Sequence, residues 1–306
     1  MMSFEEFQYY IEEHILCGWK EQADVYVKET KKNNGITYQG LYIREQEEGI
    51  APCIYLEEFY EEYKKGEEMD TVIERIRQEY RWAMERASSY EVDVLRYEDV
   101  KNRIIFRLIN YDRNRELLTN CPFIQMYDLA LTFRWLAHTD SVGISTALIT
   151  NRELDLWGVS VQELLLVARE NTRRLFPPRV GCIDSFLQEK DAEKGKLMYI
   201  MTNEQQINGA TVLLYDNLLE DFAGKIRDDF YIVPSSIHEL IAIPASEFSD
   251  PEPLIKMVAE ANRFIVSAVD ILSDSVYYYN RRNHRLTPVP EAGEDPAQGE
   301  KTEVQK

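Results

Sequence analysis

Long apolar runs are the first thing that this sequence lacks. None of its 306 residues lies in an uncharged apolar stretch of about 18 residues, the length that a membrane-spanning helix needs. The N-terminus, MMSFEEFQYYIEEHIL, has acidic residues where a secretory signal would be basic. We therefore expect a cytoplasmic protein that does not enter a membrane.

Cysteine and histidine are scarce and show no metal-binding spacing. The four cysteines lie far apart and form no CxxC pair, which argues against a zinc ribbon or a disulfide framework and predicts reduced thiols. The four histidines show neither HExxH nor HxH, so we expect no metal site. The glutamates at 57, 58, 61 and 62 could hold a hard cation, but their spacing is typical of a solvated helix face.

Glycine-rich phosphate loops are also missing. The 13 glycines are scattered, and neither GxGxxG nor GxxxxGK[ST] occurs. We expect no nucleotide cofactor, and no other cofactor is indicated.

Acidic residues are abundant. The formal charge is −19, and residues 1–100 alone hold 24 acidic and 12 basic residues. Such a surface repels phosphate backbones, so direct nucleic-acid binding is not expected. The surplus favours solubility, and an acidic face for a partner is the alternative.

The apolar spacing predicts an α+β fold. Apolar residues recur every three or four positions in helices at 4–15, 56–66 and 70–87, and again from Glu98 to about Asn110. Alternating runs flank Asn34-Gly35, a pair that accepts the positive φ of a tight hairpin. Ser160 and Glu163 form a capping box before a helix.

Further strands and helices follow the same pattern. PFIQMYDLALTFRWLA and VGISTALIT are expected as two strands, and LMYIMT and GATVLLY as another pair. FYIVP and HELIAIP form a third pair, VYYYNRRNHRLTPV a fourth, and NLLEDFAGKIR, PEPLIKMVAEANRF and a short stretch at 183–188 are expected helices. Recurring hairpin–helix units predict mainly antiparallel sheets covered by helices.

The pattern suggests four regions along the chain. They are an acidic helix–hairpin–helix region at 1–92, a middle α+β region at 93–190, a C-terminal hairpin–helix–hairpin–helix region at 191–290, and a tail at 291–306. The tail has no apolar period and is expected to be disordered.

Several long motifs resemble an uncharacterised protein family. They are SFEEF, NNGITYQGLYIRE, IAPCIYLEEFYEEY, WGVSVQELLLVARENTRRLFPP, MYIMTNEQQINGATVLLYDNLLEDFAG and FYIVPSSIHELIAIP. Together they resemble, over residues 2–287, a domain of unknown function common in gut anaerobic bacteria. The part from MYIMTN to HELIAIP is similar to a second uncharacterised family of bacterial cytosolic proteins. Neither resemblance implies an activity, a cofactor or catalytic residues.

One short segment carries the candidate catalytic residues, Ser235, Ser236, His238 and Glu239. In a hydrolase, His238 could deprotonate a serine while a carboxylate orients the ring. However, His238 and Glu239 would point to opposite faces of a strand, and Pro234-Ser235-Ser236 is typical of a turn. The chain also lacks a GxSxG elbow. We therefore favour a turn over a triad.

Basic residues supply the candidate ligand-binding positions. Lys101, Arg103, Arg107, Arg113 and Arg115 form one cluster, and Arg173, Arg174 and Arg179 form another. They could bind an anionic ligand, but pairing with the acidic surplus of residues 1–100 needs no new partner and is preferred. Arg173, Arg174 and Asn203 are the candidate ligand-binding residues.

Two functions follow from these patterns. The favoured one is a non-enzymatic interaction or regulatory protein, with a protein partner and no catalytic signature. The alternative is a hydrolase-like enzyme whose site is assembled around His238.

Overall fold

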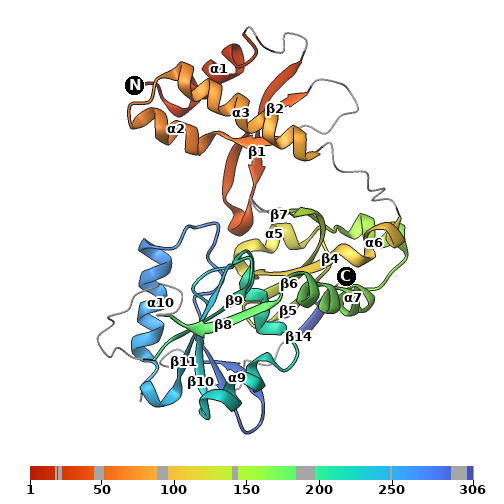
Figure 1. Ribbon diagram of the computed structural model, residues 1–306, viewed down its shortest axis with the longest axis vertical. Coiled ribbons are helices and arrows are strands. Elements are labelled where there is room, and N and C mark those ends of the chain that lie inside the picture. The colour runs from red at the N-terminus through yellow and green to blue at the C-terminus, as the bar shows by residue number, and fades with distance from the viewer. Residues whose placement is uncertain are drawn as a thin grey trace. The chain divides into compact units, whose positions relative to one another are not determined.

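The chain divides into two compact units, Met1–Glu91 and Val92–Lys306 (Figure 1). The computed structural model describes residues 1–17, 19, 23–44, 52–87, 96–139, 144–183, 197–248, 250–290 and 302–305. Within the described ranges, no helix is both long and apolar enough to cross a membrane.

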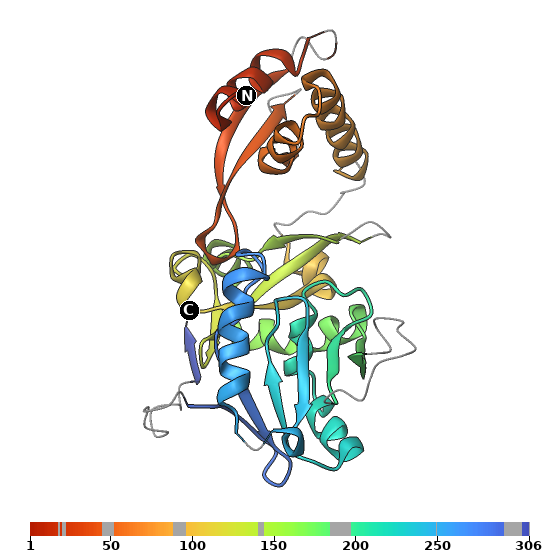
Figure 2. The same ribbon diagram turned by 90° about the vertical axis from the view of Figure 1, so that its left-hand side faces the viewer.

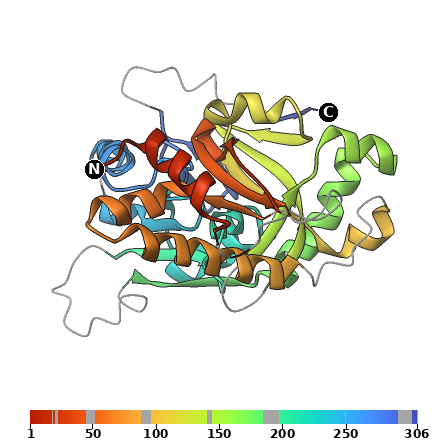
Figure 3. The same ribbon diagram turned by 90° about the horizontal axis from the view of Figure 1, so that it is seen from above.

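The small unit packs three helices against an antiparallel sheet with the strand order β1-β2-β3. Its strands are β1 Asp24–Lys31, β2 Thr37–Arg44 and β3 Cys53–Tyr55, and its helices are α1 Phe4–His14, α2 Leu56–Lys64 and α3 Met69–Ala87 (Figure 3). The helix and strand residues bury one common core, which includes Phe7, Ile11, Leu41, Ile43, Phe59, Ile76 and Tyr80. The three helices predicted here from apolar spacing are confirmed.

The β1–β2 hairpin turns at the predicted Asn34-Gly35 pair. Asn34 has φ 60° and Gly35 has φ 67°, the left-handed region that Asn and Gly tolerate best. The strands pair from Asp24↔Arg44 to Lys31↔Thr37, and the connection contains the short 3₁₀ helix η1 Asn33–Gly35. The predicted hairpin is confirmed.

The large unit contains two antiparallel sheets. One has the order β14-β5-β6-β4 with β7 also paired to β6, and the other has the order β13-β12-β10-β11-β9-β8. The strands of the first are β4 Ile104–Asn110, β5 Phe123–Met126, β6 Leu129–Thr139, β7 Ile144–Leu148 and β14 Thr302–Gln305. Those of the second are β8 Pro178–Cys182, β9 Tyr199–Asn203, β10 Phe230–Val233, β11 Leu240–Pro244, β12 Tyr277–Asn280 and β13 Arg285–Pro288.

Helices fill the space around both sheets. The α-helices are α4 Tyr97–Val100, α5 Arg115–Leu118, α6 Asn151–Trp157, α7 Val161–Leu175, α9 Leu218–Ile226 and α10 Glu252–Phe264. The 3₁₀ helices are η2 Lys101–Arg103, η3 Asp112–Asn114, η4 Gly209–Leu214 and η5 Ala245–Glu247. At α7, Ser160 Oγ accepts from the Glu163 N–H at 3.2 Å, which confirms the predicted helix start.

The six-stranded sheet is buried on both faces. Phe230 and Ile232 of β10 join a core shared with the other sheet, α7 and η4. The intervening Tyr231 and Val233 join a second core with α10, which runs alongside the sheet in Figure 2. A strand buried on both faces reads as a continuous apolar run, and this explains the sequence FYIV. The predicted α+β class with mostly antiparallel sheets is confirmed.

The helix predicted at 98–110 is wrong from Ile104 onward. Helical structure ends at Arg103, and Ile104–Asn110 form β4, which pairs with β6 from Ile104↔Trp135 to Asn110↔Leu129. The apolar run IIFRLIN fits a helical period and a buried strand equally well. Its β-branched residues and the neighbouring β6 favour the strand.

The strand predicted at GATVLLY is also wrong, because Gly209–Leu214 form the 3₁₀ helix η4. A Cβ atom on Gly209 would collide with Thr202 Oγ1 and the His238 carbonyl oxygen, so the backbone approaches β9 more closely than another residue allows. Its apolar side chains are largely buried, but on a 3₁₀ helix.

Three smaller predictions differ from the structure or fall outside it. The single strand predicted at 122–137 is two strands, β5 and β6, which turn at Tyr127, where φ is 57°. The tail expected to be disordered contains β14, antiparallel to β5; strand pairing uses backbone groups and needs no apolar period. The helix expected at 183–188 lies, apart from Ile183, outside the described residues.

We predict that Leu240→Ala lowers the free energy of unfolding by about 2–5 kcal/mol, because the side chain is fully buried in the shared core. Leu166→Ala, at a side chain that is 68% exposed on α7, is the matched control and should change it by less than about 0.5 kcal/mol. Chemical denaturation measures both values. Equal effects would contradict the assignment of β11 to the core.

Candidate functional site

The candidate serines lie in the connection between β10 and β11, two strands that pair antiparallel as predicted. Ser235 Oγ donates to the Glu239 carbonyl oxygen at 3.1 Å, and Ser236 Oγ accepts from the His238 N–H at 3.0 Å. The Ser236 N–H also donates to the Glu239 carbonyl oxygen at 3.3 Å. Both hydroxyls therefore bind backbone groups of the connection itself, as serines in turns commonly do, and Ser235 Oγ also lies 3.4 Å from Glu239 Oε1.

His238 is held by two groups outside this connection. Its Nδ1 accepts from the Asn208 N–H at 3.2 Å, and its Nε2 lies 3.3 Å from Asp270 Oδ1. Because Nδ1 acts as an acceptor, the proton of the neutral ring lies on Nε2 and is donated to Asp270. The structure thus brings His238 to a carboxylate, but the carboxylate is Asp270 and not Glu239. Both ring nitrogens are occupied without contact to Ser235 or Ser236.

Asn203 and the paired arginines bind the protein's own backbone. Asn203, at the end of β9, is buried and exchanges hydrogen bonds with the N–H and the carbonyl oxygen of Ile207. Arg173 Nη1 donates to the Asp216 carbonyl oxygen at 2.5 Å, and Arg174 Nη2 donates to the Asn102 carbonyl oxygen at 2.9 Å. These contacts stabilise loops around α7.

The preferred pairing of the basic clusters with residues 1–100 is largely wrong. Arg113 pairs with Asp274 at 2.7 Å and Arg115 with Asp112 at 2.6 Å, so the partners lie within the large unit. Lys101 does pair with an acidic residue of the range 1–100, but this is Glu98, three residues earlier on the same short helical segment. The numbers of acidic and basic residues along the chain did not predict which acidic residues the fold brings close to these basic side chains.

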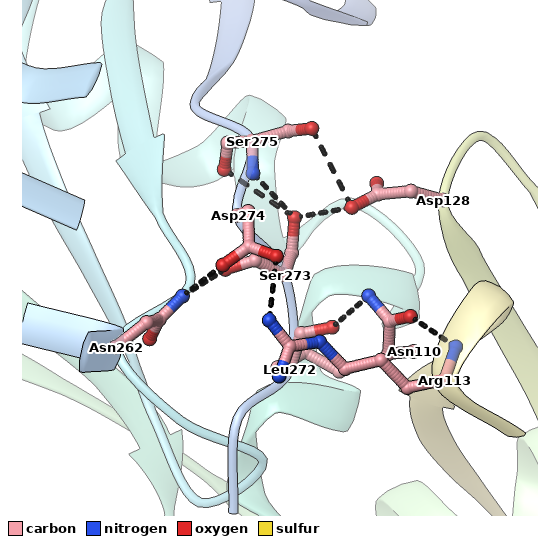
Figure 4. Close-up of polar contacts among 8 residues, drawn as sticks. All are labelled: Asn110, Arg113, Asp128, Asn262, Leu272, Ser273, Asp274 and Ser275. Atoms are coloured by element: carbon pink, nitrogen blue, oxygen red, sulfur yellow. Dashed lines mark hydrogen bonds and ion pairs between the residues drawn. The ribbon is translucent and has the colours of Figure 1, made fainter. Parts of the chain in front are cut away.

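A polar network joins the two sheets of the large unit and was not foreseen. Ser273 Oγ, fully buried, donates to Asp128 Oδ2 at 2.6 Å, and Ser275 Oγ donates to the same oxygen at 3.4 Å (Figure 4). The Tyr277 hydroxyl donates to Asp128 Oδ1. Burial, and then the negative charge of Asp128, raise the pKa of Tyr277 well above its usual value, so the phenol stays a neutral donor.

The same segment is fixed by a second group of contacts. Asn110 Nδ2 donates to the Leu272 carbonyl oxygen at 3.1 Å, and Asn110 Oδ1 accepts from the Arg113 N–H at 2.9 Å (Figure 4). Asp274 accepts from Arg113 Nη2 at 2.7 Å and from Asn262 Nδ2 at 2.8 Å. Every hydroxyl and carboxylate in the network has a partner, and the Asp128 carboxylate that accepts from Ser273 also accepts from Ser275 and Tyr277, so we interpret the arrangement as structural.

An apolar cavity of about 460 Å³ lies beside β4, β5 and β6. We call it the apolar cavity. Its wall is formed mainly by Phe106, Leu108, Leu131, Leu165, Leu213 and Leu219, from both strands and helices. Arg169, Asp216, Glu220 and His284, all about half exposed, stand at its edge. Arg169 Nη2 pairs with Asp216 Oδ1 at 2.8 Å.

A second, much smaller cavity contains two arginines. Arg107 of β4 and Arg134 of β6 line a space of about 10 Å³ together with Asn203 and Asn208. Both arginines interrupt apolar strands, in IIFRLIN and LTFRWLA. That interruption is the sequence signal that could have identified them, because a charged side chain in a buried strand is uncommon.

In the parts of the chain that the structure describes, we find neither a cluster of metal ligands nor a disulfide. No three His, Cys, Asp or Glu side chains gather there to hold a metal ion. None of the four cysteines, all within the described ranges, forms a disulfide.

We predict that Asp128→Ala lowers the free energy of unfolding by about 2–4 kcal/mol, because three hydroxyl groups lose their acceptor. Asp274→Ala in the same network is the matched control. Its carboxylate is 54% exposed, so loss of the Arg113 pair should cost at most about 1 kcal/mol. Urea denaturation compares them, and a larger effect at Asp274 would contradict the role given to Asp128.

Comparison with known proteins gives a family and no activity. No curated protein and no solved structure matches the chain. The model of a family of unknown function, DUF5688, matches residues 4–281, which is most of the chain. The chain therefore belongs to the DUF5688 family of unknown function.

Proposed function

We propose that this chain is a non-enzymatic binding protein and that its ligand is a small, mainly apolar molecule held in the apolar cavity. The observation that supports this most is the cavity itself. Its volume of about 460 Å³ lies within the range of small-molecule sites, which are typically mostly apolar clefts with a few polar groups.

The polar groups at the cavity edge indicate the ligand's chemistry. Arg169 is already paired with Asp216, whereas Glu220 lies 3.7 Å from His284. The Tyr279 hydroxyl contacts His284 Nδ1 at 3.4 Å, and burial followed by the charge of Glu220 raises the pKa of Tyr279. The edge therefore offers more negative than positive charge, which favours a ligand with an apolar body and a neutral or cationic polar end.

The lining residues support binding without chemistry. No serine, threonine, cysteine or lysine stands among the side chains that line the apolar cavity, so hydroxyl (Ser/Thr), thiol and amine nucleophiles are missing from its described wall. A ligand held without reaction would suit a regulatory protein, in which occupancy changes contact with a protein partner. A bacterial origin, a cytoplasmic location and the lack of nucleic-acid binding belong to the same proposal, supported by the motifs and the net charge of −19.

A variant whose side chain fills the apolar cavity tests the proposal. We predict that Leu165→Trp weakens binding of N-phenyl-1-naphthylamine, an uncharged fluorescent amine, at least about tenfold, because the indole occupies the cavity. Leu166→Trp is the matched control: the neighbouring side chain is 68% exposed and its replacement should change the affinity by less than about twofold. Fluorescence titration measures the dissociation constants, and circular dichroism confirms that both variants fold. No saturable binding by the natural sequence, or equal affinities for both variants, would refute the proposal.

The alternative, a hydrolase-like enzyme, is favoured by one observation, the contact between His238 and Asp270. Such a pair could act as base and orienting group. Against it, His238 Nδ1 is taken by the Asn208 N–H, and neither turn serine contacts the ring.

We predict that the natural protein and His238→Ala behave alike in a screen of generic esters, amides and phosphoesters, because the ring is engaged in structural contacts. Ser236→Ala serves as a second variant in the same screen. A hydrolytic activity that is present in the natural protein and lost from a correctly folded His238→Ala protein would favour the enzyme instead.

A further inference from the structure

Two arginines lie close together inside the large unit. Arg107 is on β4 and Arg134 is on β6, and the register pairs Arg107 with Thr132 and Ile105 with Arg134. Successive side chains alternate between the faces of a sheet, so Arg107 and Arg134 share one face as diagonal neighbours. Two positive charges at this spacing repel each other unless a negative charge lies nearby.

The hydrogen bonds of the two arginines are incomplete. Arg134 Nε donates to Thr146 Oγ1 at 2.7 Å, and Arg134 Nη2 to the Thr146 carbonyl oxygen at 3.3 Å. Arg107 Nε is shielded from solvent and has no acceptor among the described residues. A buried donor without an acceptor is destabilising and uncommon in folded proteins.

The charges around Arg107 do not balance. Burial, and then the charge of Arg134, lower the pKa of Arg107 to about 10, while Asp270 acts in the opposite direction. Arg107 is still charged at neutral pH at that value. Arg134 pairs with a hydroxyl and a carbonyl group, both neutral, and Asp270 also accepts from the neutral His238 ring. Among the described residues, two cations and one carboxylate leave a local excess of one positive charge.

A small cavity adjoins both arginines. Its volume of about 10 Å³ is close to that needed by one water molecule, so a phosphate or sulfate does not fit without rearrangement. Asn203, Asn208 and Thr211 also line the cavity. The cavity is therefore about large enough for a single atom, and its walls are polar and positively charged.

We propose that this cavity is a binding site for one monovalent anion of halide size, with chloride as the ligand. One such anion neutralises the excess charge and supplies an acceptor for Arg107 Nε. A water molecule would supply the acceptor but would leave the charge unbalanced. The site is separate from the apolar cavity and does not depend on the function proposed for it.

The test is the thermal midpoint of unfolding at constant ionic strength. Sodium gluconate is replaced stepwise by sodium chloride or bromide, so that halide identity changes while screening does not. We predict that the midpoint of the natural protein rises saturably, by roughly 3–6 °C at a halide concentration ten times the dissociation constant. No difference between gluconate and halide would overturn the proposal and leave water as the occupant.

Variants of single arginines show whether the halide that raises the midpoint binds at this cavity. Arg107→Met removes one of the two charges and should abolish the halide-dependent rise. Arg103→Met, at an exposed arginine just before β4, is the matched control and should retain it in full. A rise that survives in Arg107→Met, or disappears in Arg103→Met, would place the halide elsewhere.

A direct measurement covers the case in which Arg107→Met does not fold. The width of the ³⁵Cl resonance of sodium chloride should increase on addition of the natural protein and return to its original value on addition of excess bromide. Arg107→Lys, which keeps the charge but loses the guanidinium donors, should weaken the broadening. Broadening of equal size with Arg107→Lys and the natural protein would exclude Arg107 as a ligand.

Discussion

The hydrogen bonds to Asp128 hold the large unit's two sheets together. Ser273, Ser275 and Tyr277 donate to this one carboxylate, which lies at the turn between β5 and β6. They come from a segment that leads into β12 of the other sheet. A carboxylate that accepts several buried hydroxyl protons at once is a strong constraint, because any rearrangement leaves a donor without an acceptor.

The position of this segment determines the surroundings of both cavities. At its beginning, Asp270 holds His238 and acts electrostatically on Arg107. At its end, β12 carries Tyr279 to the apolar cavity, and the β12–β13 hairpin carries His284 to the same place. The segment that Asp128 binds thus carries Asp270, which acts on Arg107, and Tyr279, which lines the apolar cavity.

The strand β4 separates two chemical environments. Leu108 lines the apolar cavity and Arg107 lines the arginine cavity, while Phe106 borders both. This follows from the two-residue period of a strand, which sends neighbouring side chains to opposite faces. The helix expected for this segment would have grouped Ile104, Ile105 and Leu108 on one face and left no such division.

Local signals in the sequence identified several elements correctly. Asn34-Gly35 predicted a hairpin because few other residue pairs tolerate two successive positive φ angles. Ser160 predicted the start of α7 because its hydroxyl satisfies a helix N–H that has no other partner. The β10–β11 pair was predicted from two short apolar runs joined by a proline and serine turn. In each case the structure depends on residues close together in the chain.

The sequence by itself therefore determined the α+β class, the hairpins with tight turns, and most of the helices with an apolar stripe. Only the tertiary structure decided that IIFRLIN is a strand and GATVLL a 3₁₀ helix, because the partner strand β6 and the His238 carbonyl oxygen that Gly209 approaches belong to other segments of the chain. It also decided which carboxylate meets His238, and it brought Arg107 and Arg134 to one cavity. Local preferences act over a few residues, whereas these contacts depend on burial and pairing between segments that come together only when the chain folds.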